Sequence, residues 1–132
     1  MKNSIEKIKL FSRNVLGCQC PEEVFAKIEI SDEKLALKGL QTFRRIIVGD
    51  RLLIYVLELH DQSACRDALL ALLQEGVLEK KERRLNRLRI VIASEELDSI
   101  RSIAEKTFDG FEGKDEKVHL HVVSPNEILD VL

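Results

Sequence analysis

The sequence predicts an α+β fold: an α/β two-layer sandwich with a ferredoxin-like βαββαβ core, extended by a C-terminal helix and strand. Short β-rich runs alternate along the 132 residues with segments of helical periodicity. Two of the runs, 43–48 and 51–59, are separated by a two-residue connection. The runs at 88–92 and 117–123 flank a helical segment, which indicates a βαβ unit with parallel strands. The length suits a single domain, 1–132.

The N-terminal elements are the hardest to assign. Residues 7–12 begin with apolar and polar residues in alternation, which favours a first strand with one buried face. A helix from residue 4 to about 15 competes with this strand, because apolar residues there also have helical spacing. A short helix should begin at Pro21, since proline suits the first helical position and the carboxylates that follow suit the first turn. Residues 30–41 match no clear pattern beyond one helical turn at 35–38.

The middle of the chain predicts a hairpin and a central strand. Gly49 at the first turn position, followed by Asp50, fits a type II′ turn. Residues 52–57 are apolar on both faces, so this strand should lie in the middle of the sheet or at an interface.

Two helices and a capped terminal turn complete the pattern. The first of these two helices follows the central strand and should be capped by Asp61 or Ser63. It should stop or kink at Gly76, with a charged continuation over 77–84. Ser94 caps the next helix, which should run from 95 to about 108. Residues 124–127, Ser-Pro-Asn-Glu, form a capping box for a short C-terminal helix.

Composition narrows the function classes. Hydrophobic residues make up 45% and charged residues 33%, which is typical of a globular protein. Aromatic residues are 5% and tryptophan is absent, which argues against a stacking platform for nucleic acid. The net charge of −2 provides no attraction to nucleic acid or to an anionic membrane. With no apolar leader and no run long enough to span a bilayer, we expect a cytoplasmic protein that binds no membrane.

The segment Cys18-Gln19-Cys20-Pro21 has the greatest chemical potential in the sequence. Cys20 lies at the expected N-cap of a helix, where unpaired N–H groups and the helix dipole stabilise a thiolate. A thiol pair between a first strand and a first helix resembles thioredoxin-fold redox proteins, and that resemblance implies thiol chemistry. The spacing differs, being Cys-x-Cys rather than Cys-x-x-Cys, and Glu22 with Glu23 opposes the thiolate.

Metal binding is the alternative use of the same pair. Two thiolates two residues apart can hold one soft ion such as Zn²⁺, although a tetrahedral site needs two further ligands. His119 and His121 are the next candidates, because residues two apart on a strand point to the same side. A second chain could also supply its own cysteine pair. The competing interpretation is that Cys18 packs, Cys20 caps and the histidines form a polar strand face.

Three other features are weaker. His60-Asp61 follows the expected central strand, where ligands of α/β sheets often bind, but strand termination and helix capping explain both residues. Cys65 lies beside alanines on a helix and should be a packed core thiol. The basic run 80–89 could contact phosphates, yet acids balance it and no aromatics interleave, so nucleic acid is not the expected partner.

The sequence contains none of the common nucleotide-binding or hydrolase motifs. We therefore carry two hypotheses forward. The first is a metal- or thiol-dependent protein built on Cys18 and Cys20, with zinc or another thiolate-bound metal as the candidate cofactor. The second is a non-enzymatic binding or assembly module, homo-oligomeric, whose cysteines are structural.

Overall fold

A mixed five-stranded sheet forms the centre of the described chain. The computed structural model describes residues 4–17, 25–35 and 42–131. The strands lie in space in the order of the sequence. They are β1 (Ile28–Lys34), β2 (Thr42–Val48), β3 (Leu52–Glu58), β4 (Arg87–Ala93) and β5 (Val118–Val123). Strands β1, β2 and β3 pair antiparallel, whereas β3, β4 and β5 pair parallel.

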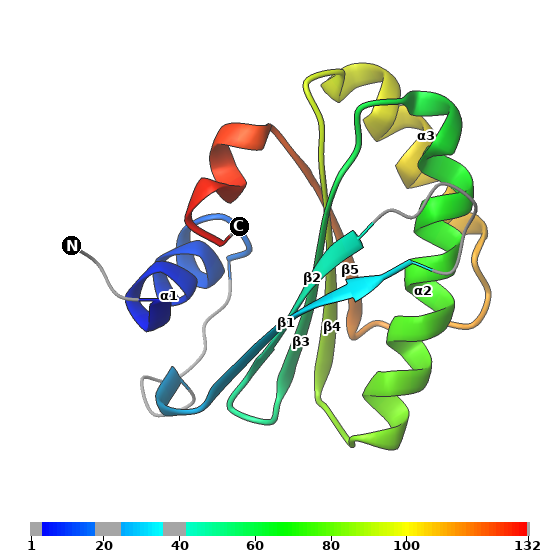
Figure 1. The fold of residues 1–132 in the computed structure, drawn as a ribbon. Coiled ribbons are helices and arrows are strands. Elements are labelled where there is room, and N and C mark those ends of the chain that lie inside the picture. The colour runs from blue at the N-terminus through cyan, green and yellow to red at the C-terminus, as the bar shows by residue number, and fades with distance from the viewer. Residues whose placement is uncertain (1–3, 18–24, 36–41, 132) are drawn as a thin grey trace.

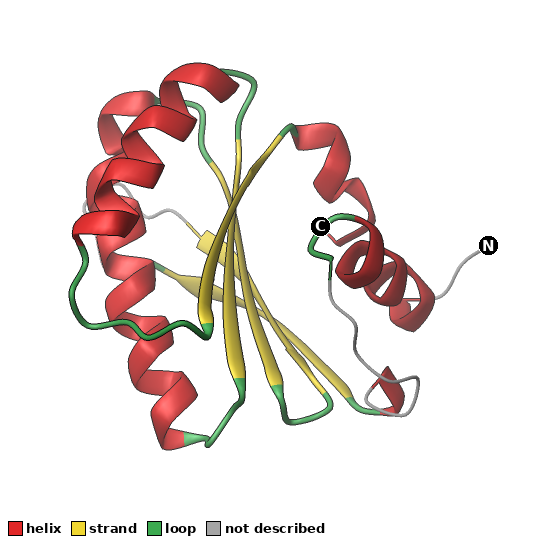
Figure 2. Ribbon diagram, turned by 180° about the vertical axis from the view of Figure 1, so that it is seen from behind, coloured by secondary structure: helices red, strands yellow, loops and turns green. Residues whose placement is uncertain are grey.

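Helices lie on both sides of the sheet (Figure 1). On one side are α2 (Cys65–Glu82), with the short 3₁₀ helix η2 (Gln62–Ala64) before it, and α3 (Leu97–Gly110). On the other side are α1 (Ser4–Asn14) and the 3₁₀ helix η3 (Pro125–Val131), as the view from behind in Figure 2 also shows. Helix α1 and η3 therefore form a third layer, in addition to the two layers that the sequence predicted. None of the described helices is long and apolar enough to cross a bilayer.

Each face of the sheet has its own apolar cluster. The α2 and α3 side buries Leu53, Tyr55 and Leu57 of β3, while the α1 side buries Leu52, Ile54 and Val56 of the same strand. Strand β3 is third of the five and is buried on both faces, which confirms the prediction of a central strand. The core of the described residues is mostly aliphatic, with Phe11, Phe25, Phe43 and Tyr55 as its aromatic members.

The first element is a helix, so the predicted strand at residues 7–12 is wrong. Ile8 and Phe11 are buried together with Ser12, which is the i, i+3, i+4 face of a helix. Leu10, which strand alternation would have buried beside Ile8, is half-buried. The apolar spacing of three and four outweighed the short alternation because a helix packs this face onto the α1 side of the sheet.

The ferredoxin-like strand order is not confirmed. Strand β1 forms an antiparallel pair directly with β2, and strands that follow one another in sequence are neighbours throughout the sheet. The helix expected from Pro21 and most of the turn at 35–38 lie outside the described residues. Residues 30–34, which matched no pattern, belong to β1, whose polar sequence Ser-Asp-Glu-Lys suits an edge strand.

The hairpin between β2 and β3 is confirmed, but its turn differs from the prediction. Gly49 and Asp50 both have positive φ, 60° and 54°, as in a type I′ rather than a type II′ turn. The Arg51 N–H donates to the Val48 carbonyl at 3.1 Å and closes the turn.

Helix α2 continues through Gly76, where the sequence predicted a stop or a kink. Glycine is needed at position 76 because the packing of α2 against the sheet leaves no room for a side chain. A Cβ at this position would lie 2.7 Å from Cδ2 of Leu88 and 3.1 Å from Cε2 of Tyr55. Gly76 therefore lets α2 approach the sheet closely.

The C-terminal predictions are confirmed more closely. Strands β4 and β5 flank α3 and pair parallel, as expected of a βαβ unit. The predicted cap at Ser94 is two residues too early: the N-cap of α3 is Glu96, whose N–H donates to the Ser94 hydroxyl at 3.1 Å. The Ser124 N–H donates to the Glu127 carboxylate at 2.9 Å, which is the reciprocal bond of a capping box and begins η3.

Candidate functional site

Four polar side chains interrupt the apolar face of the sheet on the α1 side. Strand alternation places Arg87 and Arg89 of β4 on this face with Val91, and His119 and His121 of β5 with Val123. The positions beside them on β3 are Leu52 and Ile54. We call Arg87, Arg89, His119 and His121 the arginine–histidine cluster.

Each arginine of the cluster contacts one histidine across the strands. Nη1 of Arg87 lies 2.8 Å from Nε2 of His119, and Nη1 of Arg89 lies 3.0 Å from Nε2 of His121. Arginine is always the donor in such a pair, so both imidazoles accept through Nε2 and carry their proton on Nδ1. All four side chains are half-buried.

The electrostatics of the cluster keep the histidines neutral. Burial, together with the neighbouring Arg89 and His119, lowers the pKa of His121 to about 4. Burial, Arg89 and Arg87 lower the pKa of His119 in the same direction. The cluster therefore carries two positive charges at neutral pH, both on the guanidinium groups.

Arg89 also ties the cluster to the chain that follows α1. Its Nη1 donates to the Leu16 carbonyl at 3.0 Å. Its Nε is buried and has no hydrogen-bond partner within the described part of the chain. Burial lowers the pKa of this guanidinium, and the charge of Arg87 lowers it further.

The cluster lacks a described counter-ion. The described neighbours of its guanidinium groups are two neutral imidazoles and a carbonyl. Burial and neighbouring cationic or imidazole groups, and no carboxylate of the described residues, shift the pKa values of Arg89, His119 and His121. Two partly buried cations in this setting can attract an anion or stabilise an anionic group nearby.

The structure brings two of the four predicted metal ligands together. His119 and His121 share one face, as the strand spacing predicted, but each directs Nε2 at an arginine. Cys18 and Cys20 lie outside the described residues, and so does Pro21. Within residues 4–17, 25–35 and 42–131, no group of three or more His, Cys, Asp or Glu side chains could hold a metal ion.

The third cysteine is a core residue. Cys65 begins α2, is a free thiol and is fully buried. Burial raises the pKa of its thiol, so it is a poor nucleophile near neutral pH. This position confirms the prediction of a packed thiol.

His60 and Asp61 follow β3 at its carboxyl end. The His60 side chain is 82% exposed, and its Nε2 is 4.0 Å from a Glu58 carboxylate oxygen. Asp61 accepts from the Ser63 N–H at 2.9 Å and caps η2. The capping role is therefore present.

The basic residues do not form one stripe. Arg83 pairs with Glu29, and Lys80 lies 3.9 Å from Asp115. Arg44 pairs with Asp32 on the neighbouring strand. Arg87 and Arg89, the last members of the run, lie on the opposite face from α2.

Sequence reasoning missed the arginines of the cluster because it treated them as the end of the basic run. The available signal was alternation: Arg-x-Arg on one strand and His-x-His on the next strand of a βαβ unit. Parallel neighbours with matching alternation put all four side chains on one face once the register is known.

A second polar cluster lies under α2. The Tyr55 hydroxyl donates to Glu79 at 2.5 Å, and Arg45 forms a bidentate ion pair with the same carboxylate. Burial raises the pKa of Glu79, but the bonds from Arg45 and Tyr55 outweigh it and leave the pKa below its ordinary value. Every charge in this cluster is paired, so it anchors α2 to the sheet.

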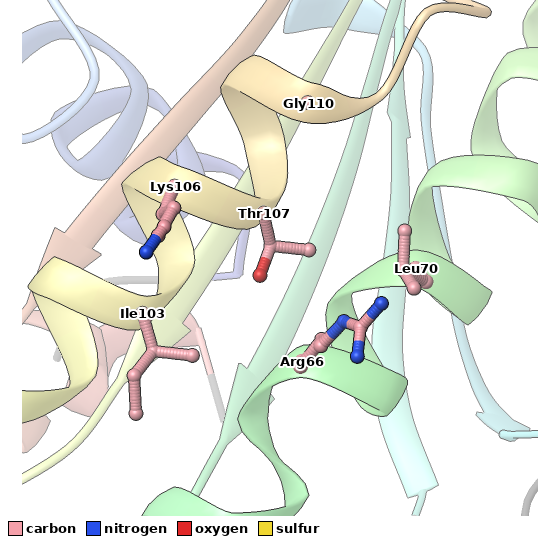
Figure 3. Close-up of a pocket in the computed structure, with 6 residues that line it drawn as sticks. All are labelled: Arg66, Leu70, Ile103, Lys106, Thr107 and Gly110. Carbon is pink, nitrogen blue, oxygen red and sulfur yellow. The ribbon is translucent and has the colours of Figure 1, made fainter.

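An open pocket of about 480 Å³ lies between α2 and α3 (Figure 3). Its lining consists of Arg66, Leu70, Ile103, Lys106, Thr107 and Gly110. The two cationic side chains come from exposed positions on different helices. The arginine–histidine cluster is the stronger candidate site because its charges are partly withdrawn from water.

Comparison of the sequence with models of known protein families and with curated proteins finds no match.

Proposed function

We propose that this protein binds a phosphate group, free or carried by a small molecule, at Arg87 and Arg89 on the α1 face of the sheet. The observation that carries the proposal is the pair of half-buried guanidinium groups without a described counter-ion. Withdrawing a cation from water without pairing it costs free energy. A bound anion offsets that cost.

Phosphate fits the donors better than a carboxylate does. Arginine presents a planar fork of N–H groups, which suits bidentate contacts to phosphate oxygens. Residues two apart on a strand are about 6.6 Å apart at Cα, so two long side chains can converge on one tetrahedral anion. The unpartnered Nε of Arg89 supplies a further donor.

The pairing of three other arginines favours a single phosphate over a nucleic-acid backbone. Arg44, Arg45 and Arg83 are each paired with a carboxylate, so they do not extend the cluster into a basic track. The net charge of −2 points the same way.

Calorimetric titration with inorganic phosphate tests the proposal. Wild-type protein should bind it, and Arg89→Gln should weaken the affinity at least about tenfold, because a charge-assisted hydrogen bond contributes about 1.5–3 kcal/mol. Arg44→Gln is the matched control, since Arg44 is already paired with Asp32 and should leave the affinity unchanged. Equal phosphate affinity in wild type and Arg89→Gln would overturn the proposal, as would no binding by wild type.

The rival source of negative charge lies within the chain. Glu22 and Glu23 belong to the segment 18–24, outside the described residues. If these carboxylates neutralise the arginines, the double variant Glu22→Gln with Glu23→Gln should gain phosphate affinity over wild type by tenfold or more. That gain would show that the counter-ion is internal. Unchanged affinity in the double variant supports an external anion.

The second candidate function is thiol chemistry at Cys18 and Cys20. The observation that favours it is the bond from Arg89 to the Leu16 carbonyl, two residues before Cys18 in the sequence. Two residues of chain span at most about 7 Å. A guanidinium near a thiol lowers the pKa of that thiol, which counters the opposing effect of Glu22 and Glu23.

A metal site is less favourable in the same place. The guanidinium groups of Arg87 and Arg89 repel a metal ion, and the bonds that His119 and His121 accept from them occupy Nε2 of both rings. Thiol chemistry is therefore favoured over the zinc site.

Thiol reactivity across pH tests this second candidate. We expect two fast thiols and one slow one, because Cys65 is buried. Cys18→Ser with Cys20→Ser should abolish the fast reaction, and Arg89→Gln should raise its apparent pKa. Fast reaction that survives the double cysteine variant would refute the candidate. Stoichiometric zinc that is present in wild type and lost in that variant would restore the metal hypothesis.

A further inference from the structure

Within the described residues, β5 is the last strand of the sheet and pairs with β4 alone, so its other side is an edge. The Leu88 N–H donates to the Lys117 carbonyl at 3.0 Å, and the Ser94 N–H donates to the Val123 carbonyl at 3.1 Å. The backbone carbonyls of Lys117, just before β5, and of Val123, its last residue, therefore point towards β4. Because successive backbone groups of a strand point to opposite sides, Val118, Leu120 and Val122 direct their N–H and C=O groups to the open side.

The two ends of this edge are satisfied locally, whereas its middle is not. The Val118 N–H donates to the Asp115 carbonyl at 3.3 Å, and the Val122 carbonyl accepts from Nη2 of Arg101 at 3.2 Å. No such local bond covers Leu120 among the described contacts. The strand sequence Val-His-Leu-His-Val-Val contains no proline, glycine, lysine or carboxylate. The side chains of the strand itself therefore do not block the edge in the way that proline or lysine usually does.

We propose that a second copy of this chain covers the edge by pairing its own β5 antiparallel to this one, with a two-fold axis at Leu120. Two copies of Leu120 would then exchange both N–H···O=C bonds, as in a hydrogen-bonded antiparallel pair. The sheet would continue through the axis, and each edge would hide the other. This inference does not depend on the phosphate site, which lies on the α1 face.

Helix α3 supplies charge complementarity for this arrangement. It runs opposite to β5, and the bond from Arg101 places that residue level with Val122. Asp109 is eight residues further, about 12 Å along the helix, which matches the roughly 13 Å from Val122 back to Val118. The two-fold axis exchanges these levels, so Arg101 of one copy faces Asp109 of the other.

A shallow groove of about 350 Å³ runs along this edge between β5 and α3, and Arg101, Glu105 and Asp109 are among the residues that line it. All three are exposed. Glu105 lies halfway between the other two and close to the level of the axis, where it would approach its own copy. The arrangement therefore predicts two favourable Arg101–Asp109 pairs and one unfavourable Glu105–Glu105 pair across the axis. Charge variants at these positions should change dimerisation in different directions.

Analytical ultracentrifugation of charge variants tests the interface. Wild type should form a dimer. Arg101→Glu and Asp109→Arg should each weaken dimerisation at least about tenfold, because each places like charges opposite one another. The double variant that carries both changes should recover most of the affinity. Glu105→Gln should strengthen the dimer, and Arg66→Glu, an exposed change on α2, should have no effect.

Three outcomes overturn the inference: a wild-type monomer up to about 1 mM, a dimer insensitive to both single charge variants, or failure of the double variant to recover. Phosphate titration of Arg101→Glu separates the two proposals. Its affinity for inorganic phosphate should equal that of wild type, since Arg101 lies outside the arginine–histidine cluster.

Discussion

At the scale of the residue, His121 is held neutral by its surroundings. Burial lowers its pKa to about 4 from an ordinary value of 6.5, with Arg89 and His119 acting in the same direction. Titration of the ring protons by NMR should therefore give a pKa near 4 for His121. A pKa close to 6.5 would mean that the ring is solvated and that the arginine is not beside it.

The same shift predicts how stability depends on pH. Between pH 6.5 and about 4 the unfolded chain binds a proton at His121 that the folded chain does not. The free energy of unfolding should therefore fall as pH decreases through that window, by up to about 3 kcal/mol from this residue. His121→Gln should flatten the dependence when urea unfolding is compared at pH 7 and pH 4.5. An equally steep dependence in the variant would assign it to other groups.

Glu79, unlike the arginines of the arginine–histidine cluster, is a charge with described partners. Its carboxylate accepts a hydrogen bond from the Tyr55 hydroxyl and forms an ion pair with Arg45. Glu79→Gln removes the charge and leaves Arg45 without its ion-pair partner, so we expect a loss of about 3 kcal/mol in unfolding free energy. Glu75→Gln, one turn earlier, is the matched control. Burial and nearby carboxylates raise the pKa of Glu75, so removing its charge should cost nothing. Equal losses in both variants would contradict the assigned role of Glu79.

At the scale of the element, α2 depends on the absence of a side chain at Gly76. Alanine there gains about 1 kcal/mol in helix propensity but places a methyl group against fully buried Leu88 and Tyr55. We expect Gly76→Ala to lower the unfolding free energy by about 1 kcal/mol net. Gly110→Ala, at the end of α3 with nothing within 4 Å of the new Cβ, should be neutral or stabilising. Thermal unfolding of the two variants, compared side by side, checks the difference.

The elements also show how far the sequence could lead. Strands β2 to β5 and helices α2 and α3 were predictable because apolar runs, alternation or helical spacing mark each of them in the sequence. The first element was not, because residues 7–12 satisfy both alternation and helical spacing, and only packing against the sheet decides between them. Gly76 was misread for a related reason: a glycine needed for close approach and a glycine that ends a helix look the same in sequence.

At the scale of the whole molecule, the candidate site is a product of topology. The sequence identified His119 and His121 as sharing a face, but the partners of these residues lie 32 positions earlier on β4. The Leu16 carbonyl, in the chain just after α1, reaches the cluster from 73 positions before Arg89. Register and crossover place these groups together, and neither can be read from local patterns. Cys18 and Cys20 remain sequence-based candidates because they lie outside the described residues.

Anion binding should raise the stability of the whole molecule. A ligand that binds only the folded state raises the unfolding free energy by RT ln(1 + [L]/Kd). Phosphate should therefore raise the unfolding temperature of wild type more than that of Arg87→Gln with Arg89→Gln, at equal ionic strength. Because phosphate also stabilises proteins through exclusion from their surface, the difference between the two proteins is the informative quantity. Identical increases would contradict specific binding.

The central claim is that the guanidinium groups of Arg87 and Arg89 bind an anion. The Nε–H group of Arg89 is the most direct probe of that binding. This group is buried and has no described partner. Titration with inorganic phosphate, followed by the ¹H–¹⁵N resonance of Arg89 Nε, should move that signal in a saturable way and slow its hydrogen exchange. The Nε resonance of Arg44 should stay in place. A signal for Arg89 that does not respond to phosphate, while the protein remains folded, would contradict the account.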